Sequence, residues 1–250
     1  MNIIVLVKRV PDTEANIKIT SDKQSIDETE VKFVVNPYDE FAIEEALKIK
    51  EAGGAESVTA LSLGTESSVQ TLRTALAMGV DEAVLIKTDR AVTDGLTVAK
   101  ALAFVLKEMD FGLILMGKEA IDDGNMQVGP MLGEVLDIPC ITVVSKLTLE
   151  GDKVVIERET DGAVEVLESQ TPSIITCQKG LNEPRYPSIR GIMQSKRKQI
   201  VEKTVELAVE NITVDSLSYP PSRPAGKIVG EGAEAVPELV KLLKEEAKVI

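Results

Sequence analysis

The sequence predicts an α/β protein whose mostly parallel sheet is covered by helices on both faces. Two observations predict this class: short aliphatic runs alternate with longer segments of helical periodicity, and the runs are apolar throughout. Strands of this composition are buried on both faces, and the intervening helices supply the right-handed crossovers that parallel neighbours need. After residue 142 the pattern changes to alternating apolar and polar residues, which adds a β-meander to the sheet.

Four strand and helix pairs are predicted in order before the meander. The second helix illustrates the evidence, because Val69, Leu72 and Leu76 stand near helical spacing and Gly79 follows where the helix should end. The predicted strands are 3–7, 57–63, 83–87 and 112–117, and the predicted helices are 39–52, 65–78, 96–108 and 128–136.

The meander has turn signals at 150–152 and 161–162, and we expect the apolar run 173–177 to close it. The residues after Gln199 are sparse in large apolar side chains and rich in proline, which predicts an extended arm. A final amphipathic helix at 237–249 has a wide apolar side, so it packs either on its own domain or on another chain. The arm's prolines include Pro220, Pro221 and Pro224, and the apolar side consists of Leu239, Val240, Leu242 and Leu243.

The chain therefore divides into an α/β domain at 1–198 and an extended arm at 199–250. Its 250 residues with 44% hydrophobic content suffice for a core, and the net charge of −13 excludes a general binder of nucleic acid or anionic membranes. No run reaches the roughly 18 apolar residues that span a bilayer, so we expect no membrane insertion. The amino terminus lacks the pattern of a secretory signal, and we expect a cytoplasmic protein.

Catalytic and metal-binding residues are not expected in this sequence. It has no histidine, and its two cysteines, Cys140 and Cys177, stand in apolar strand-like runs. We therefore predict buried, inert thiols and exclude the usual metal sites and Cys-His nucleophiles. No side chain in this sequence offers a redox centre, so any electron transfer requires a bound cofactor.

Ligands of open parallel sheets bind beyond the carboxyl ends of the strands, which places the loops after Val7, Leu63 and Met116 at the candidate site. The third loop, 117–128, is the richest in glycine and leads into a helix near Gln127, a geometry that suits a phosphate group. The alternative is an ordinary strand-to-helix turn with Asp123 or Asn125 as the N-cap. The motif alone leaves both open.

The segment 181–198, named here the docking segment, predicts a protein-binding surface. Pro184 and Pro187 disfavour a helix through Tyr186 and stiffen the chain. An apolar group followed by a cationic cluster suits docking onto an acidic partner. The apolar residues are Ile189, Ile192 and Met193, and the cations are Lys196, Arg197 and Lys198.

Five blocks resemble the electron transfer flavoprotein β-subunit family and cover most of the chain. The most specific is NEPRYPSIRGIM at 182–193, followed by the lysine and arginine run. This resemblance implies a Rossmann-like domain of the adenine-nucleotide-binding type. The other blocks are VLVKRVPD at 5–12, NPYDEFAIEEALKIKE at 36–51, TLRTALAMGVDEAVLI at 71–86 and GKEAIDDGNMQVGPML at 117–132.

The resemblance implies that the loop 117–128 helps to hold AMP, as in the housekeeping carriers, or a second FAD, as in electron-bifurcating members. A further FAD is shared with an α subunit, and Tyr38 either approaches that flavin or is only a turn residue. The cofactor-binding residues implied by matching motif are Leu6, Asn36, Pro37, Tyr38, Asp39, Leu63, Gly117, Lys118, Glu119, Ala120, Ile121, Asp122, Asp123, Gly124, Asn125, Met126, Gln127 and Val128.

Two departures from the family pattern affect the choice of nucleotide. Met126 stands where many AMP-type members have asparagine, whereas Asp123 replaces a glycine typical of bifurcating members and favours AMP. The ending QVGP is common to both groups. AMP is therefore the expected ligand, with FAD as the alternative.

The resemblance further implies a heterodimer that takes electrons from dehydrogenases, such as the acyl-CoA dehydrogenases of fatty acid β-oxidation, and passes them to a quinone-linked or other acceptor. Such a subunit is a carrier rather than an enzyme, and its arm packs on the α subunit. Arg190 replaces a proline common in the family. The alternatives are a bifurcating subunit that oxidises NADH and a universal-stress type nucleotide sensor. The implied partner-binding residues are Tyr186, Ile189, Ile192, Met193, Lys196, Arg197 and Lys198.

Overall fold

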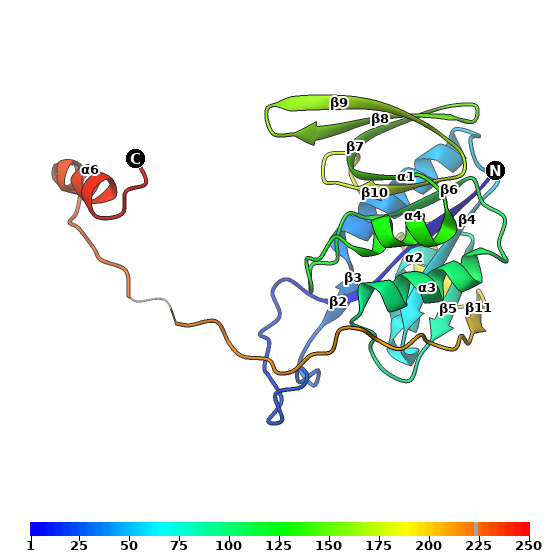
Figure 1. Cartoon of the computed structure of the whole chain (residues 1–250), viewed down its shortest axis with the longest axis horizontal. Helices are drawn as coiled ribbons and strands as arrows, with labels where there is room; N and C mark the ends of the chain where they lie inside the picture. Colours follow the sequence, from blue (N-terminus) through cyan, green and yellow to red (C-terminus); the bar gives the residue numbers. More distant parts are fainter. Residues whose placement is uncertain (223–224) are drawn as a thin grey trace. The chain divides into compact units, whose positions relative to one another are not determined.

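The computed structural model describes residues 1–222 and 225–250, so Pro224 of the expected arm lies outside the described residues. The chain divides into two compact units, 1–216 and 217–250. The first unit contains a large, mostly parallel sheet with helices on both faces, which confirms the predicted α/β class (Figure 1).

Nine strands form the main sheet of the first unit, in the order β11-β5-β4-β1-β6-β10-β7-β8-β9. All neighbouring pairs are parallel except β7 with β8 and β8 with β9. The strands are β1 (Asn2–Leu6), β4 (Ser57–Gly64), β5 (Glu82–Lys87), β6 (Leu113–Gly117), β7 (Cys140–Glu150), β8 (Lys153–Thr160), β9 (Ala163–Gln170), β10 (Ser173–Cys177) and β11 (Ile200–Lys203).

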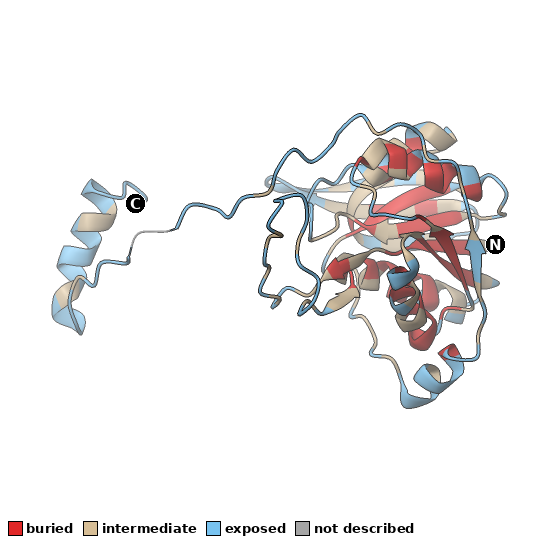
Figure 2. Ribbon diagram, turned by 90° about the horizontal axis from the view of Figure 1, so that it is seen from below, coloured by how far each residue is buried: buried red, intermediate tan, exposed pale blue. Residues whose placement is uncertain are grey.

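Helices α1 (Pro37–Glu51) and α2 (Val69–Met78) pack on one face of this sheet, and α3 (Gly95–Leu106) and α4 (Val128–Leu136) pack on the other. Each face has its own apolar core, and the central strands contribute alternate side chains to both. Buried residues accordingly concentrate on the sheet and on the helix sides that contact it (Figure 2). This is the packing that fully apolar strands require.

The remaining elements are short. Strands β2 (Arg9–Pro11) and β3 (Phe33–Val35) form an antiparallel pair, η1 (Glu66–Ser68) precedes α2, and α5 (Ile189–Ser195) lies in the docking segment. The described part of the second unit contains η2 (Ala233–Ala235) and α6 (Val236–Glu245). No residue of α6 is buried: Leu239 is 43% and Val240 46% exposed, and Leu242 and Leu243 are half-buried.

Strand β10 lies elsewhere than the sequence suggested. We expected it to close the meander, but it is inserted between β6 and β7 and is parallel to both. All five of its residues are buried, as befits a central strand. The meander of β7, β8 and β9 instead forms one edge of the sheet.

The boundary expected after residue 198 also differs from the observed division, which keeps residues up to Ser216 with the first unit. Strand β11 extends the sheet by pairing with β5, in register from Ile200 opposite Ala83. Farther along, the backbone N–H of Asn211 donates to Oδ2 of Asp94 at 2.9 Å. The first part of the expected arm is therefore attached to the domain.

The topological switch point of the sheet lies at β1. The chain runs from β1 to β4 and β5 on one side, then crosses to β6 on the other side. Because crossovers leave in opposite directions here, the general rule for open α/β sheets places a ligand site beyond the carboxyl ends of β1 and β6. These ends are Leu6 and Gly117, and both belong to the predicted nucleotide site.

Candidate functional site

A buried pair of polar side chains, Asn36 and Asp39, joins the two strand ends to the start of α1. Oδ1 of Asp39 accepts from the N–H of Gly117 at 3.0 Å and from Nδ2 of Asn36 at 2.8 Å. Oδ2 accepts from the N–H of Lys8 at 2.7 Å. One carboxylate thus ties together the segment after β1, the first turn of α1 and the end of β6.

Asn36 extends this hub into the loop 117–128. Its Nδ2 donates to the carbonyl of Glu119 at 2.8 Å, and its Oδ1 accepts from the N–H of Ile121 at 3.2 Å. An asparagine is needed here because the loop presents one acceptor and one donor to the same side chain. Asn36 is 1% exposed, so water cannot replace these bonds.

The burial of Asp39 has an electrostatic consequence. Desolvation raises the pKa of this carboxyl to about 7, although the hydrogen bonds from Asn36, Lys8 and Gly117 act in the opposite direction. Gly117 is required by the same close packing, because a Cβ there would lie 2.5 Å from Oδ1 of Asp39 and 2.6 Å from Cβ of Tyr38. Both observations show how tightly β6 meets α1.

Lys8 partly neutralises the negative charge of Asp122 and Asp123 in the loop. Its Nζ lies 2.7 Å from Asp122 Oδ1 and 3.0 Å from Asp123 Oδ2. Burial lowers the pKa of Lys8, but the two carboxylates outweigh it and raise that pKa, so the amine stays charged. The loop consequently carries a partly neutralised charge rather than two free carboxylates facing the site.

The loop reaches α4 through residues with left-handed backbone. Gly124 has φ of +62° with open space where a side chain would be, and Met126 has φ of +55°. Gln127 is the N-cap of α4 and makes no side-chain capping bond, while Oδ1 of Asp123 accepts from the N–H of Asn125 at 3.1 Å. Neither Asp123 nor Asn125 is therefore the N-cap that the alternative interpretation assigned to them, and the first N–H groups of α4 have no capping side chain.

The other predicted residues take varied positions at this edge. Leu6 is buried and Leu63 is half-buried, both in the core beneath α3 and α4. Pro37 starts α1, and Nζ of Lys118 lies 4.9 Å above the ring of Tyr38. The carbonyl of Ala120 accepts from Asp123 and Gly124, which closes the turn. Leu63 belongs to β4, the neighbour of β1, and the other residues adjoin the ends of β1 and β6 or the loop.

The cysteines agree with the prediction only in part. Cys177 is fully buried, but Cys140 is half-buried. Burial raises the pKa of both thiols, to about 11 for Cys140, so neither is a thiolate near neutral pH. Across residues 1–222 and 225–250, no cluster of acidic or cysteine side chains could hold a metal ion, and no helix is long and apolar enough to cross a bilayer.

The docking segment is extended up to Ser188 and then forms α5. Ser188 caps this helix, its hydroxyl accepting from the N–H of Gly191 at 2.9 Å. Gly191 packs against the carbonyl of Ala77 at the end of α2, and a Cβ at this position would overlap that oxygen. Ser195, one turn later, is 3% exposed and faces the same way.

The apolar side chains of the docking segment lie largely outside the core. Tyr186 is 94%, Ile189 is 81%, Met193 is 61% and Ile192 is 45% exposed. Since residues four apart share a helix face, Ile189 and Met193 project opposite to the Gly191 and Ser195 face. Beside them is a cleft of about 380 Å³ between the segment and α2, lined by Gln70, Arg73, Thr74, Ala77, Pro187, Ile192, Ser195 and Lys196.

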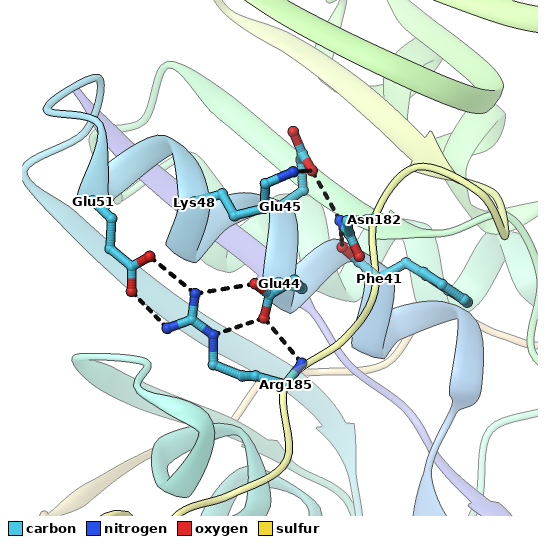
Figure 3. A network of polar contacts seen from close by, with 7 residues as sticks. All are labelled: Phe41, Glu44, Glu45, Lys48, Glu51, Asn182 and Arg185. Atoms are coloured by element: carbon cyan, nitrogen blue, oxygen red, sulfur yellow. Dashed lines mark hydrogen bonds and ion pairs between the residues drawn. The ribbon is translucent and has the colours of Figure 1, made fainter.

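The amino-terminal part of the docking segment is bound to α1 by a polar network (Figure 3). Arg185 contacts Glu44 through Nε at 2.7 Å and Nη2 at 3.0 Å, and it also pairs with Glu51. Nδ2 of Asn182 donates to Glu45 Oε2 at 2.8 Å and to the carbonyl of Phe41 at 3.0 Å. Sequence reasoning missed Arg185. The signal that could have found it was the pair Glu44 and Glu45, which stand among the apolar residues of this helix, since buried carboxylates require partners.

At the other end of the segment, two basic residues bind backbone carbonyls. Arg73 donates to the carbonyls of Ser195 and Lys198. Nζ of Lys198 donates to the carbonyls of Val80 at 2.7 Å and Asp81 at 2.9 Å. Lys198 therefore differs from Lys196 and Arg197, which are exposed.

Comparison with known proteins shows the same family over the whole chain. The electron transfer flavoprotein domain family matches residues 24–208. The chain is 44% identical to the electron transfer flavoprotein subunit beta of Bacillus subtilis and 40% identical to that of Bradyrhizobium diazoefficiens. Each alignment covers the full length of both chains. It is also 41% identical, again over both full lengths, to the mitochondrial subunit beta of Arabidopsis thaliana. The chain therefore belongs to the electron transfer flavoprotein β-subunit family.

Proposed function

We propose that this chain is the β subunit of a heterodimeric electron carrier that accepts electrons from dehydrogenases, the acyl-CoA dehydrogenases among them, and delivers them to a quinone-linked or other acceptor. It acts as a carrier subunit rather than as an enzyme. FAD, held mainly by the α subunit, supplies the redox chemistry when bound. The residues of this chain bind, orient and dock, and none of them needs to react.

One observation carries the proposal: Ile189 and Met193 are exposed on the face of α5 that points away from α2. Two large apolar side chains on a short, capped helix cost solvation energy unless a partner covers them. The cationic residues Lys196 and Arg197 follow directly and favour an acidic partner. This arrangement suits transient docking of a reduced dehydrogenase close to the flavin.

The nucleotide that we propose for the loop 117–128 is AMP, in a structural role. Its support is the amino terminus of α4, where no side chain caps the first N–H groups, so that they can serve as donors to a phosphate. The pairing of Lys8 with Asp122 and Asp123 reduces the repulsion that these carboxylates would exert. The hub of Asn36 and Asp39 fixes the loop without using those donors.

The second candidate is a bifurcating subunit that binds FAD in the same pocket and oxidises NADH. The ending QVGP at 127–130 occurs in both AMP-type and bifurcating members, so it is compatible with this candidate. In either case we propose that α6 packs on the α subunit, because none of its leucine and valine side chains is buried in this chain.

The deciding experiment is the cofactor content of the heterodimer. The chain is co-expressed with its α subunit, the complex is purified and denatured, and released FAD and AMP are quantified against protein. One FAD with one AMP supports the simple carrier. Two FAD without AMP supports the bifurcating subunit, and absence of any flavin refutes the flavoprotein role.

A further inference from the structure

We propose that Arg185 and Arg73 are positioning residues that hold the docking segment in its binding conformation, one at each end. The inference rests on the proposed docking role of Ile189. Neither arginine belongs to the exposed tip of the segment, which is α5 with Ile189 and Met193. Arg185 holds the residues before α5, here called the stem, and Arg73 holds backbone carbonyls at and after the end of α5. The partner in question is the dehydrogenase that covers Ile189 and Met193.

Arg185 forms the first clamp, on the residues of the docking segment that precede α5. The guanidinium of Arg185 spans two carboxylates of α1, Glu44 and Glu51, which lie seven residues apart and so on the same helix face. The backbone N–H of Arg185 also donates to Glu44 Oε2 at 3.1 Å. The hydrogen bonds that Arg185 donates to Glu51 and Glu44 raise the pKa of Arg185 above its already high value, so the charge persists at any physiological pH. Glu44 is 6% exposed, which makes it costly to leave unpaired.

The second clamp fixes the helix end after the tip. Arg73 of α2 donates to the carbonyl of Ser195, the last residue of α5, and to that of Lys198. These carbonyls have no partner within the helix, so a side-chain donor replaces the missing turn. Lys198 in turn binds the carbonyls of Val80 and Asp81. The segment is thereby anchored to the end of α2 and the start of β5.

Between the clamps, α5 is ordered by the Ser188 cap and by the packing of one of its faces on α2. Helix α5 has seven residues, too few to be stable alone in water. Its contact with the domain is the face of Gly191 and Ser195, where Gly191 meets the carbonyl of Ala77. Without the clamps, the partner would have to order this helix on binding, and that entropic cost would weaken docking. The arginines therefore order the docking segment before the partner binds.

The test compares Arg185→Met and Arg73→Met with Arg158→Met in the intact heterodimer. Arg158 is a matched control, because it is ion-paired to Glu165 on the meander and is 32% exposed, against 34% for Arg185. A further variant, Glu51→Gln, loosens the Arg185 fork at an exposed carboxylate and so avoids stranding the buried Glu44. It guards against a simple folding defect.

Two measurements are made on each variant. Hydrogen exchange of residues 188–196 should accelerate in both arginine variants and in Glu51→Gln, and stay unchanged in Arg158→Met. With an acyl-CoA dehydrogenase and its acyl-CoA as electron donor, the KM for the flavoprotein should rise about tenfold in the arginine variants while kcat is kept. Faster exchange without a change in KM overturns the proposal.

A double-mutant cycle with Ile189→Ala separates positioning from other effects. If the arginines act by presenting Ile189, the combined variant loses less than the product of the two single losses. Strictly multiplicative losses mean that the arginines act independently of Ile189, and the inference fails. If Ile189→Ala itself leaves the KM unchanged, the docking role fails instead, whatever the arginines do.

Discussion

The side-chain amide of Asn36 lies against the carboxylate of Asp39, with Nδ2 2.8 Å from Oδ1, at the first turn of α1. Both side chains are buried. Their remaining bonds go to the segment after β1 and to the loop after β6, so a local helix-start motif connects two segments that are far apart in sequence. The loop 117–128 owes its position to this pair.

Replacing Asn36 with alanine should lower the free energy of unfolding by about 1–3 kcal/mol, because the N–H of Ile121 and the carbonyl of Glu119 each lose a buried partner. The loop 117–128 should loosen, and bound nucleotide should be lost during purification. Chemical denaturation and nucleotide analysis of the heterodimer measure both effects. Asn16→Ala, at an exposed asparagine, is the control, and equal nucleotide content in the two variants would contradict the role of Asn36.

Asp39 predicts a pH dependence of stability. Its folded pKa of about 7 exceeds the ordinary value of 3.8, so the folded protein binds more protons than the unfolded chain between these limits. Stability measured against Asp39→Asn should therefore fall as the pH rises from about 4 to about 7, and should level off above that. Urea denaturation across this range tests the sign. Parallel profiles for the two proteins would rule out a raised pKa.

Gly117→Ala should disturb the junction of β6 and α1. The added Cβ would lie 2.5 Å from Oδ1 of Asp39, so the strand end or the helix must shift. Overpacking of this kind costs about 1–3 kcal/mol. Gly124→Ala is the comparison, since open space surrounds that position and only its backbone angle of +62° opposes the change. Thermal unfolding should show the larger loss for Gly117→Ala, and the reverse order would dispute this packing.

Ile189→Ala should raise the KM of the flavoprotein for its dehydrogenase and leave bound flavin and heterodimer content intact, because the side chain is 81% exposed and contributes little to folding. Steady-state reduction by an acyl-CoA dehydrogenase measures the effect. Val166→Ala, at an aliphatic residue 64% exposed on β9, is the control. Equal kinetics in the two variants would remove the docking role of Ile189.

The cationic residues after α5 should separate into two kinds. Lys196→Gln with Arg197→Gln should slow association mainly at low ionic strength, since both residues are exposed and act through long-range attraction. Lys198→Gln should instead lower stability, because its amine binds the carbonyls of Val80 and Asp81. Stopped-flow reduction at several salt concentrations distinguishes them. A salt-independent effect of the first pair would indicate a folding role.

The sequence predicted the strand–helix order because the signals are local. Apolar runs such as 112–117 and glycines such as Gly79 report their own conformation. The loop 117–128 followed from the rule that ligands meet parallel strands at their carboxyl ends. The insertion of β10 between β6 and β7 was not predictable in this way, because a buried apolar run fits any central place in a parallel sheet equally well.

The chain by itself thus determined its fold class, its family and the segments proposed to carry its sites. Only the tertiary structure decided which side chains serve those sites at a distance, such as Lys8 on Asp122 and Arg185 on Glu44. The physical reason is that a charged side chain has no preference for one distant partner until burial removes water. Packing then selects the carboxylate within reach, and no local pattern encodes that choice.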